Sequence, residues 1–207
     1  MPAKQELSDI AFSFSHSVAF DQLRDRVKSY RELKTGPDKN SIGENLAGGI
    51  YEAFAYYFLR FGPLNNLPTN EIFLTPQETL TYYHDYLYPN VEIHDHAFTS
   101  TLESVSVPDG LLLEISDDGE SSLPIVVYEY TRNIKISNYT HKYNWFLRNR
   151  QNHPHILGQS RLCFVVPKMS KDTKRNLNDI LNIEEIDFFE IPVSAGELNN
   201  IKMMIEK

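Results

Sequence analysis

The spacing of apolar positions along the first part of the chain is that of amphipathic helices. Apolar side chains recur every three or four residues over residues 17–33 and again over 41–62. Ser41 and Glu44 form a capping box at the start of the second stretch. Another capping box, with a proline at the first helical position, opens residues 75–88. We therefore predict three helices before residue 90.

Short apolar segments with the spacing of strands follow. The predicted strands are 91–98, 100–107, 110–116, 124–131, 161–167 and 186–193. Further helices are predicted at 137–151, 171–182 and 195–207. The order of these elements predicts an α/β fold with a mixed central sheet flanked by helices. We expect a helical extension over residues 1–40 and an α/β domain over 41–207.

Length and composition suit a globular protein. The chain has 207 residues, of which 41% are hydrophobic. No apolar run approaches the roughly 18 residues that cross a bilayer, so we expect no membrane association. The N-terminus lacks the pattern of a signal peptide, and the single cysteine, Cys163, has no partner for an internal disulfide. These features predict a cytoplasmic protein.

Charge is distributed unevenly along the chain, whose net charge is −8. Residues 61–131 contain 12 Asp and Glu and no Lys or Arg, whereas residues 132–175 contain 10 Lys and Arg and one acid. An acidic block followed by a basic block is consistent with a cation site beside a face that binds a polyanion. The alternative is two solvated faces of opposite charge.

Two carboxylates stand out in the predicted hairpin. Asp109 lies at the start of one strand, and Glu129 lies inside the apolar segment of the next. A hairpin centred near residue 119 brings the two residues opposite each other, with Cβ atoms about 5 Å apart. Like charges at that distance repel, and a divalent cation with oxygen ligands would offset the repulsion.

The sequence here resembles the PD-(D/E)XK nuclease superfamily, through Pro-Asp and Glu-x-Thr separated by 19 intervening residues. The resemblance covers residues 41–193 and implies a restriction-endonuclease-like αβββαβ core. It also implies Mg²⁺, or alternatively Mn²⁺, bound by Asp109, Glu129, the backbone carbonyl of Tyr130 and Glu52. The apolar surroundings of Glu52 on its helix independently predict burial and a need for a partner or a metal. The alternative for Glu52 is an exposed position or a pair with an arginine.

The chain departs from the family pattern at Thr131, where the family usually has lysine. That lysine is thought to activate the attacking water, and strand alternation places it on the same face as the glutamate. Lys135 lies about 13 Å farther along the strand, and Arg132 points to the other face of a regular strand. Lys142, early in the next helix, could reach the site instead. Thr131 and Lys142 are therefore both candidate catalytic residues beside Glu52.

The resemblance implies a metal-dependent endonuclease that hydrolyses phosphodiester bonds, with DNA as the expected substrate. Restriction, repair and mobile-element defence are the usual settings of such proteins. We expect the basic segment 132–175 to contact the nucleic acid backbone, through Lys142, Arg148 and Arg150. A homodimer is compatible with this interpretation.

Two alternatives remain open at this level. The first is a catalytically inactive protein of nuclease fold that binds nucleic acid or a protein partner, with its basic helix only solvated. The second is a transition-metal site built on His94 and His96, which share one face of a strand, with His84 or Asp85 as a third ligand.

Overall fold

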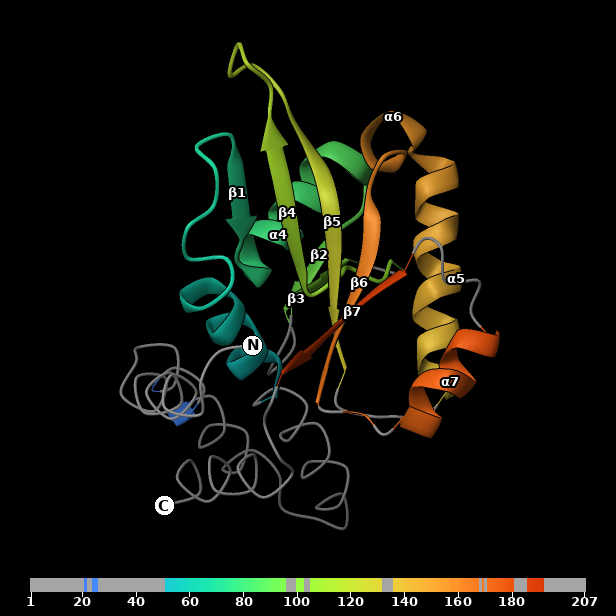
Figure 1. The fold of residues 1–207 in the computed structure, drawn as a ribbon. Coiled ribbons are helices and arrows are strands. Elements are labelled where there is room, and N and C mark those ends of the chain that lie inside the picture. The colour runs from blue at the N-terminus through green and yellow to red at the C-terminus, as the bar shows by residue number, and fades with distance from the viewer. Residues whose placement is uncertain are drawn as a thin grey trace.

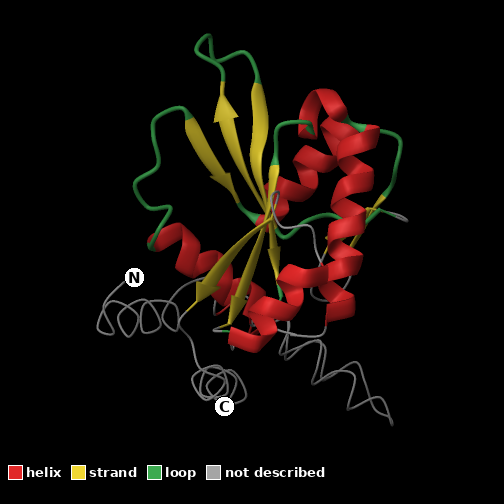
Figure 2. Ribbon diagram, turned by 45° about the vertical axis from the view of Figure 1, so that its right-hand side comes forward, coloured by secondary structure: helices red, strands yellow, loops and turns green. Residues whose placement is uncertain are grey.

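The main feature of the fold is a mixed five-stranded sheet flanked by helices (Figures 1 and 2). The computed structural model describes residues 21, 24–25, 51–95, 100–102, 105–131, 136–167, 169, 171–180 and 186–191. Within these residues the predicted α/β class and the mixed central sheet are confirmed. None of the helices that the structure describes is long and apolar enough to cross a membrane.

The strands of the main sheet follow the order β1-β4-β5-β6-β7. Their bounds are β1 Glu71–Leu74, β4 Gly110–Ile115, β5 Ser122–Tyr130, β6 Arg161–Pro167 and β7 Ile186–Ile191. β4 runs antiparallel to both β1 and β5, whereas β5, β6 and β7 are mutually parallel. A separate antiparallel pair contains β2 (Ile93–Asp95) and β3 (Ser100–Leu102).

Helical segments connect and cover the strands. They are residues 51–61, α4 (Pro76–Tyr82), the π-helical turn η1 (Tyr83–Leu87), α5 (Ile136–Asn152), α6 (Pro154–Leu157) and α7 (Lys171–Ile180). The start of α4 has the predicted capping box, in which the Thr75 hydroxyl accepts from Glu78 N–H and the Glu78 carboxylate accepts from Thr75 N–H. This closed hydrogen-bond pair fixes the first turn of α4.

The β4–β5 hairpin determines where the candidate site lies. Gly110 pairs with Tyr128, which is the register of a hairpin centred on residue 119. Gly119 has φ 72°, a left-handed conformation that favours glycine. Nearer the turn a β-bulge shifts the register between Leu112 and Leu113. The predicted hairpin is therefore confirmed. Its pairs far from the turn, Gly110 to Leu112 with Tyr128 to Val126, keep the predicted register, and only the pairs between the bulge and the turn are shifted.

Each face of the sheet has its own apolar core. On one face the helical segment 51–61 packs Phe54 and Phe58 against Tyr128 and Val165. On the other face α4, η1, α5, α6 and α7 pack against Val127 and its neighbours. Because side chains alternate along a strand, Glu129 is on the same face as Val127 and points toward α5.

The strands of the structure differ from the sequence prediction in two respects. β1 was not predicted, because its four residues alternate too briefly to stand out and only Phe73 is fully buried. The segments predicted at 91–98 and 100–107 contain strands, but these form the separate β2–β3 pair rather than part of the main sheet. The 1–40 extension, the capping box at Ser41 and the helix predicted at 195–207 lie outside the described residues.

Candidate functional site

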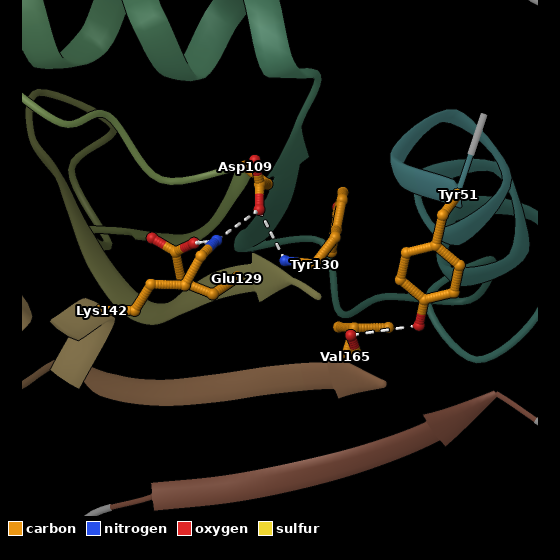
Figure 3. A network of polar contacts seen from close by, with 6 residues as sticks. All are labelled: Tyr51, Asp109, Glu129, Tyr130, Lys142 and Val165. Carbon is orange, nitrogen blue, oxygen red and sulfur yellow. Dashed lines mark hydrogen bonds and ion pairs between the residues drawn. The ribbon is translucent and has the colours of Figure 1, made fainter. Parts of the chain in front are cut away.

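The hairpin brings Asp109 and Glu129 to one end of β4 and β5. Asp109 N–H donates to the Tyr128 carbonyl oxygen at 3.0 Å, beside the Gly110–Tyr128 pair with which β4 begins. Tyr130 N–H donates to Asp109 Oδ2 at 2.6 Å (Figure 3). The Asp109 side chain is thus tied to the backbone of β5 immediately beside Glu129. A hairpin centred near residue 119 predicted that Asp109 and Glu129 would lie close together, and they do.

Lys142 brings a positive charge to both carboxylates. It lies on the buried stripe of α5 between Tyr139 and Phe146, at helical spacings of three and four residues. Tyr139 packs edge-on against Phe164 of β6, with ring centroids 4.9 Å apart. This packing holds α5 against the sheet, so Lys142 Nζ lies 3.4 Å from Asp109 Oδ2 and also contacts Glu129 Oε2 (Figure 3).

The three charged groups differ in burial. The Glu129 side chain is 3% exposed, whereas those of Asp109 and Lys142 are 22% and 29% exposed. Burial raises the pKa of Glu129 to about 8, although the Lys142 ammonium opposes this shift. Burial alone would lower the pKa of Lys142, but the negative charges of Asp109 and Glu129 outweigh it and hold that pKa well above its usual value. The lysine therefore carries its charge across the physiological pH range.

Glu52 approaches from the helical segment on the other face of the sheet. The Tyr51 hydroxyl donates to the Val165 carbonyl oxygen at 3.2 Å and anchors this part of the helix to β6 (Figure 3). Glu52 is partly buried, and burial raises its pKa to about 8, with the Asp109 charge adding to the shift and Lys142 opposing it. The site therefore combines three carboxylates with one ammonium group.

Thr131 lies two residues after Glu129, directly after the end of β5. It is 6% exposed, and its N–H donates to the Val165 carbonyl oxygen at 3.0 Å. Its side chain supplies no charge, and the positive charge at the carboxylates comes from Lys142 on α5. The other two basic candidates, Arg132 and Lys135, lie outside the described residues. Tyr130 contributes its backbone, which adjoins the Asp109 carboxylate.

The donor chemistry at Asp109 and Glu129 fits a hard divalent cation such as Mg²⁺ or Mn²⁺, which prefers oxygen ligands. In the described part of the chain, however, no group of three or more His, Cys, Asp or Glu side chains is arranged to hold a metal ion. Two carboxylates converge on one point, and the Lys142 ammonium lies there. Glu52 comes from the other face of the sheet.

The histidine alternative gains no support from the geometry. His94 is exposed on β2, and His84 pairs with its neighbour Asp85 at 2.7 Å on the surface. His96 lies outside the described residues. The described members of this set therefore do not form a common ligand group.

Two tyrosines at the site were not identified from the sequence. Tyr83 of η1 and Tyr139 of α5 are fully buried, and their hydroxyls have no hydrogen-bond partner among the described residues. Burial raises the pKa of both phenols, and the charge of Glu129 adds to the shift at Tyr83, while Lys142 opposes it at Tyr139. Tyr139 lies three residues before Lys142 on the same helical stripe, but this spacing does not distinguish it from an ordinary core tyrosine.

The basic residues of α5 lie in two environments. Arg148 is exposed, whereas the Arg150 guanidinium lies over the Phe146 ring, with Cζ 5.4 Å from the centroid. Arg161, at the start of β6, pairs with Asp187 at 3.0 Å. Of these three, Arg148 is the most available to an anionic partner.

Comparison with known proteins gives no independent assignment. No family model matches the chain, and searches of curated proteins and of solved structures found no match.

Proposed function

We propose that this protein is a Mg²⁺-dependent nuclease that hydrolyses phosphodiester bonds in DNA, with Lys142 in the role of the family's motif lysine. The observation that carries the proposal is the contact of Lys142 Nζ with both Asp109 and Glu129. The absence of lysine at position 131 was the main departure from the family pattern. A lysine delivered to the same carboxylates from α5 supplies the missing charge by another route.

The order of the elements supports the proposal. The helical segment 51–61 is followed by the antiparallel strands β1, β4 and β5, then by α5 and the parallel strand β6. This order corresponds to the αβββαβ arrangement that the resemblance implies, with α4, η1, β2 and β3 inserted between its first two strands. The candidate carboxylates lie at the junction of β4 and β5 in this arrangement.

Each residue has a distinct role in the proposed reaction. Asp109 and Glu129 would hold the metal, and Glu52 would add negative charge from the opposite face. A bound Mg²⁺ would supply Lewis-acid activation of water and phosphate. Tyr130 N–H fixes the orientation of the Asp109 carboxylate. The Lys142 ammonium, charged at neutral pH, stabilises the negative charge that develops on the phosphate oxygens.

The charge distribution supports a nucleic acid substrate, for which DNA is our proposal. Segment 132–175 contains half of the chain's 20 Lys and Arg residues, and α5 within it presents the exposed Arg148. Phosphate contacts from such residues bind without reading sequence and weaken as salt is raised. Binding to DNA should therefore fall steeply between low and physiological ionic strength.

Cleavage of supercoiled plasmid DNA in the presence of Mg²⁺ tests the proposal. The variants Asp109→Asn and Glu129→Gln keep the side-chain shape but remove the carboxylates, so each should abolish cleavage. Glu114→Gln is the matched control, because Glu114 is an exposed carboxylate on the same strand β4 and should keep wild-type activity. DNA binding without Mg²⁺-dependent cleavage by the wild type would instead support the non-catalytic alternative.

A further inference from the structure

The Lys142 ammonium lies at the point where a cation shared by Asp109 and Glu129 would bind. Its nitrogen contacts one carboxylate oxygen of each residue, Asp109 Oδ2 at 3.4 Å and Glu129 Oε2 at a shorter distance (Figure 3). Two positive charges cannot share this space without strong repulsion. The ammonium and a metal ion are therefore alternative occupants of the same pair of carboxylates.

We propose that a hard divalent cation and the Lys142 ammonium compete for Asp109 and Glu129, so that the cation binds as the lysine withdraws. The inference rests on the proposed function for its choice of cation, but its geometry stands on the described contacts alone. Lys142 then holds the carboxylates together in the metal-free protein and becomes free to meet a phosphate once the cation has bound.

The difference in exposure between Lys142 and Glu129 favours withdrawal of the lysine. Glu129 is almost fully buried in the sheet, whereas Lys142 is 29% exposed and carries its charge on a flexible four-carbon stem. Such a stem can move its ammonium into water while its methylene groups stay packed. Withdrawal thus costs the protein the ion pair but leaves the packing of α5 in place.

Two buried hydroxyls provide a second observation that points to a bound ligand. Tyr83 and Tyr139 belong to the core on the sheet face that carries Glu129, and their hydroxyls have no hydrogen-bond partner among the described residues. Buried polar groups without partners commonly mark an ordered water or ion. Mg²⁺ keeps several of its waters, and these need hydrogen-bond partners of this kind.

The test measures cation binding without any nucleic acid. Mn²⁺ binding is followed by electron paramagnetic resonance for the wild type, Lys142→Met and Lys142→Met with Glu129→Gln. Removing the competing ammonium should raise Mn²⁺ affinity at least about tenfold, and the added Glu129→Gln should remove this gain. Arg148→Met is the matched control, because it removes one positive charge from the exposed face of the same helix. An affinity gain no larger in Lys142→Met than in Arg148→Met overturns the inference.

A second measurement uses the wild-type protein, in case Lys142→Met does not fold. Acylation of Lys142 by an amine-reactive ester is followed by mass spectrometry with and without Mg²⁺, and exposed lysines serve as internal standards. Displacement of the ammonium should accelerate acylation of Lys142 alone. An unchanged rate at Mg²⁺ concentrations that saturate the site, or no cation binding at all, contradicts the competition.

These outcomes separate the two proposals. A gain of Mn²⁺ affinity in Lys142→Met without plasmid cleavage by the wild type keeps the competition and rejects the nuclease. Plasmid cleavage that depends on Asp109, with no gain in Mn²⁺ affinity, keeps the nuclease and rejects the competition.

Discussion

Gly110 offers a sensitive test of the backbone that positions Asp109. It begins β4 directly after Asp109 and opposite Tyr128. A Cβ atom added to Gly110 would lie 2.9 Å from the Tyr130 hydroxyl oxygen, 3.3 Å from Phe73 Cε2 and 3.6 Å from Tyr128 Cβ. Tyr130 is 3% exposed, so its ring can move only against other buried side chains. Gly110→Ala should therefore force β4 and β5 apart at the candidate site.

Two opposing contributions determine whether Gly110→Ala raises or lowers the free energy of unfolding. Alanine in a strand is favoured over glycine by about 0.5–1 kcal/mol, because it restricts the unfolded chain. Overpacking of a well-filled interior costs about 1–3 kcal/mol. The overpacking term is the larger one at a 2.9 Å contact, so we expect a net loss of about 1–2 kcal/mol in the free energy of unfolding.

Tyr130→Phe should rescue this loss. The substitution removes the oxygen at 2.9 Å, and that hydroxyl has no hydrogen-bond partner among the described residues. Its removal alone should therefore change stability little. In the double variant the alanine meets only the 3.3 Å and 3.6 Å contacts. The two substitutions should thus be coupled by about 1–2 kcal/mol, with the double variant more stable than the sum of the single effects.

Urea unfolding of the wild type, the two single variants and the double variant measures the coupling. Gly119→Ala is the control, since its added Cβ has no atom within 4 Å and its cost arises from a φ of 72°. That cost should be the same with tyrosine or phenylalanine at position 130. Additive effects of Gly110→Ala and Tyr130→Phe, or a Gly110→Ala protein as stable as the wild type, would refute the packing described for β4 and β5.

Two further predictions concern the rest of the fold. Thr75→Ala removes the hydroxyl that caps Glu78 N–H and should destabilise the protein by about 1 kcal/mol in urea unfolding. Thr81→Ala, on the exposed side of the same helix, is the control and should cost less than half as much. Equal losses of stability in the two variants would contradict the capping role. Burial raises the pKa of the Cys163 thiol to about 12, so at pH 8 the folded protein should react with iodoacetamide about 10³-fold more slowly than a free thiol. Because the unfolded chain loses this proton at lower pH, the free energy of unfolding should fall as pH rises from about 9 toward 12. Fast alkylation of the folded protein would contradict the burial of the thiol.

Local signals in the sequence predicted most of the sheet but not its full membership. The apolar run of β6 and the turn around Gly119 are short-range patterns, and both were predicted correctly. The predicted strands at 91–98 and 100–107 did contain β2 and β3, yet their pattern carried no information about which sheet they join. β1 was missed because a four-residue edge strand buries too little apolar surface to produce a clear periodicity.

The same distinction between local and distant information applies to the site. The proximity of Asp109 and Glu129, which both contact Lys142, depends on one hairpin, so counting residues to its turn was enough to predict it. The contact of Lys142 depends on how α5 packs across β5 and β6, which spacing alone does not determine. Sequence reasoning could name Lys142 only as one of several basic candidates. The partnerless hydroxyls of Tyr83 and Tyr139 had no sequence signal that separated them from ordinary core tyrosines.

The electrostatics of the site explain how threonine at position 131 is compatible with a charged centre. Glu129 is 3% exposed, and a buried carboxylate without a partner would be strongly destabilising. Lys142 of α5 is the partner of Glu129. Thr131, two residues after Glu129, is also buried, at 6% exposed. A lysine at 131 as well would bury a second ammonium next to the first, with repulsion between the two opposing any gain from the carboxylates. A single lysine is therefore favoured here, and its position on a helix rather than on the strand leaves it free to move without disturbing the sheet.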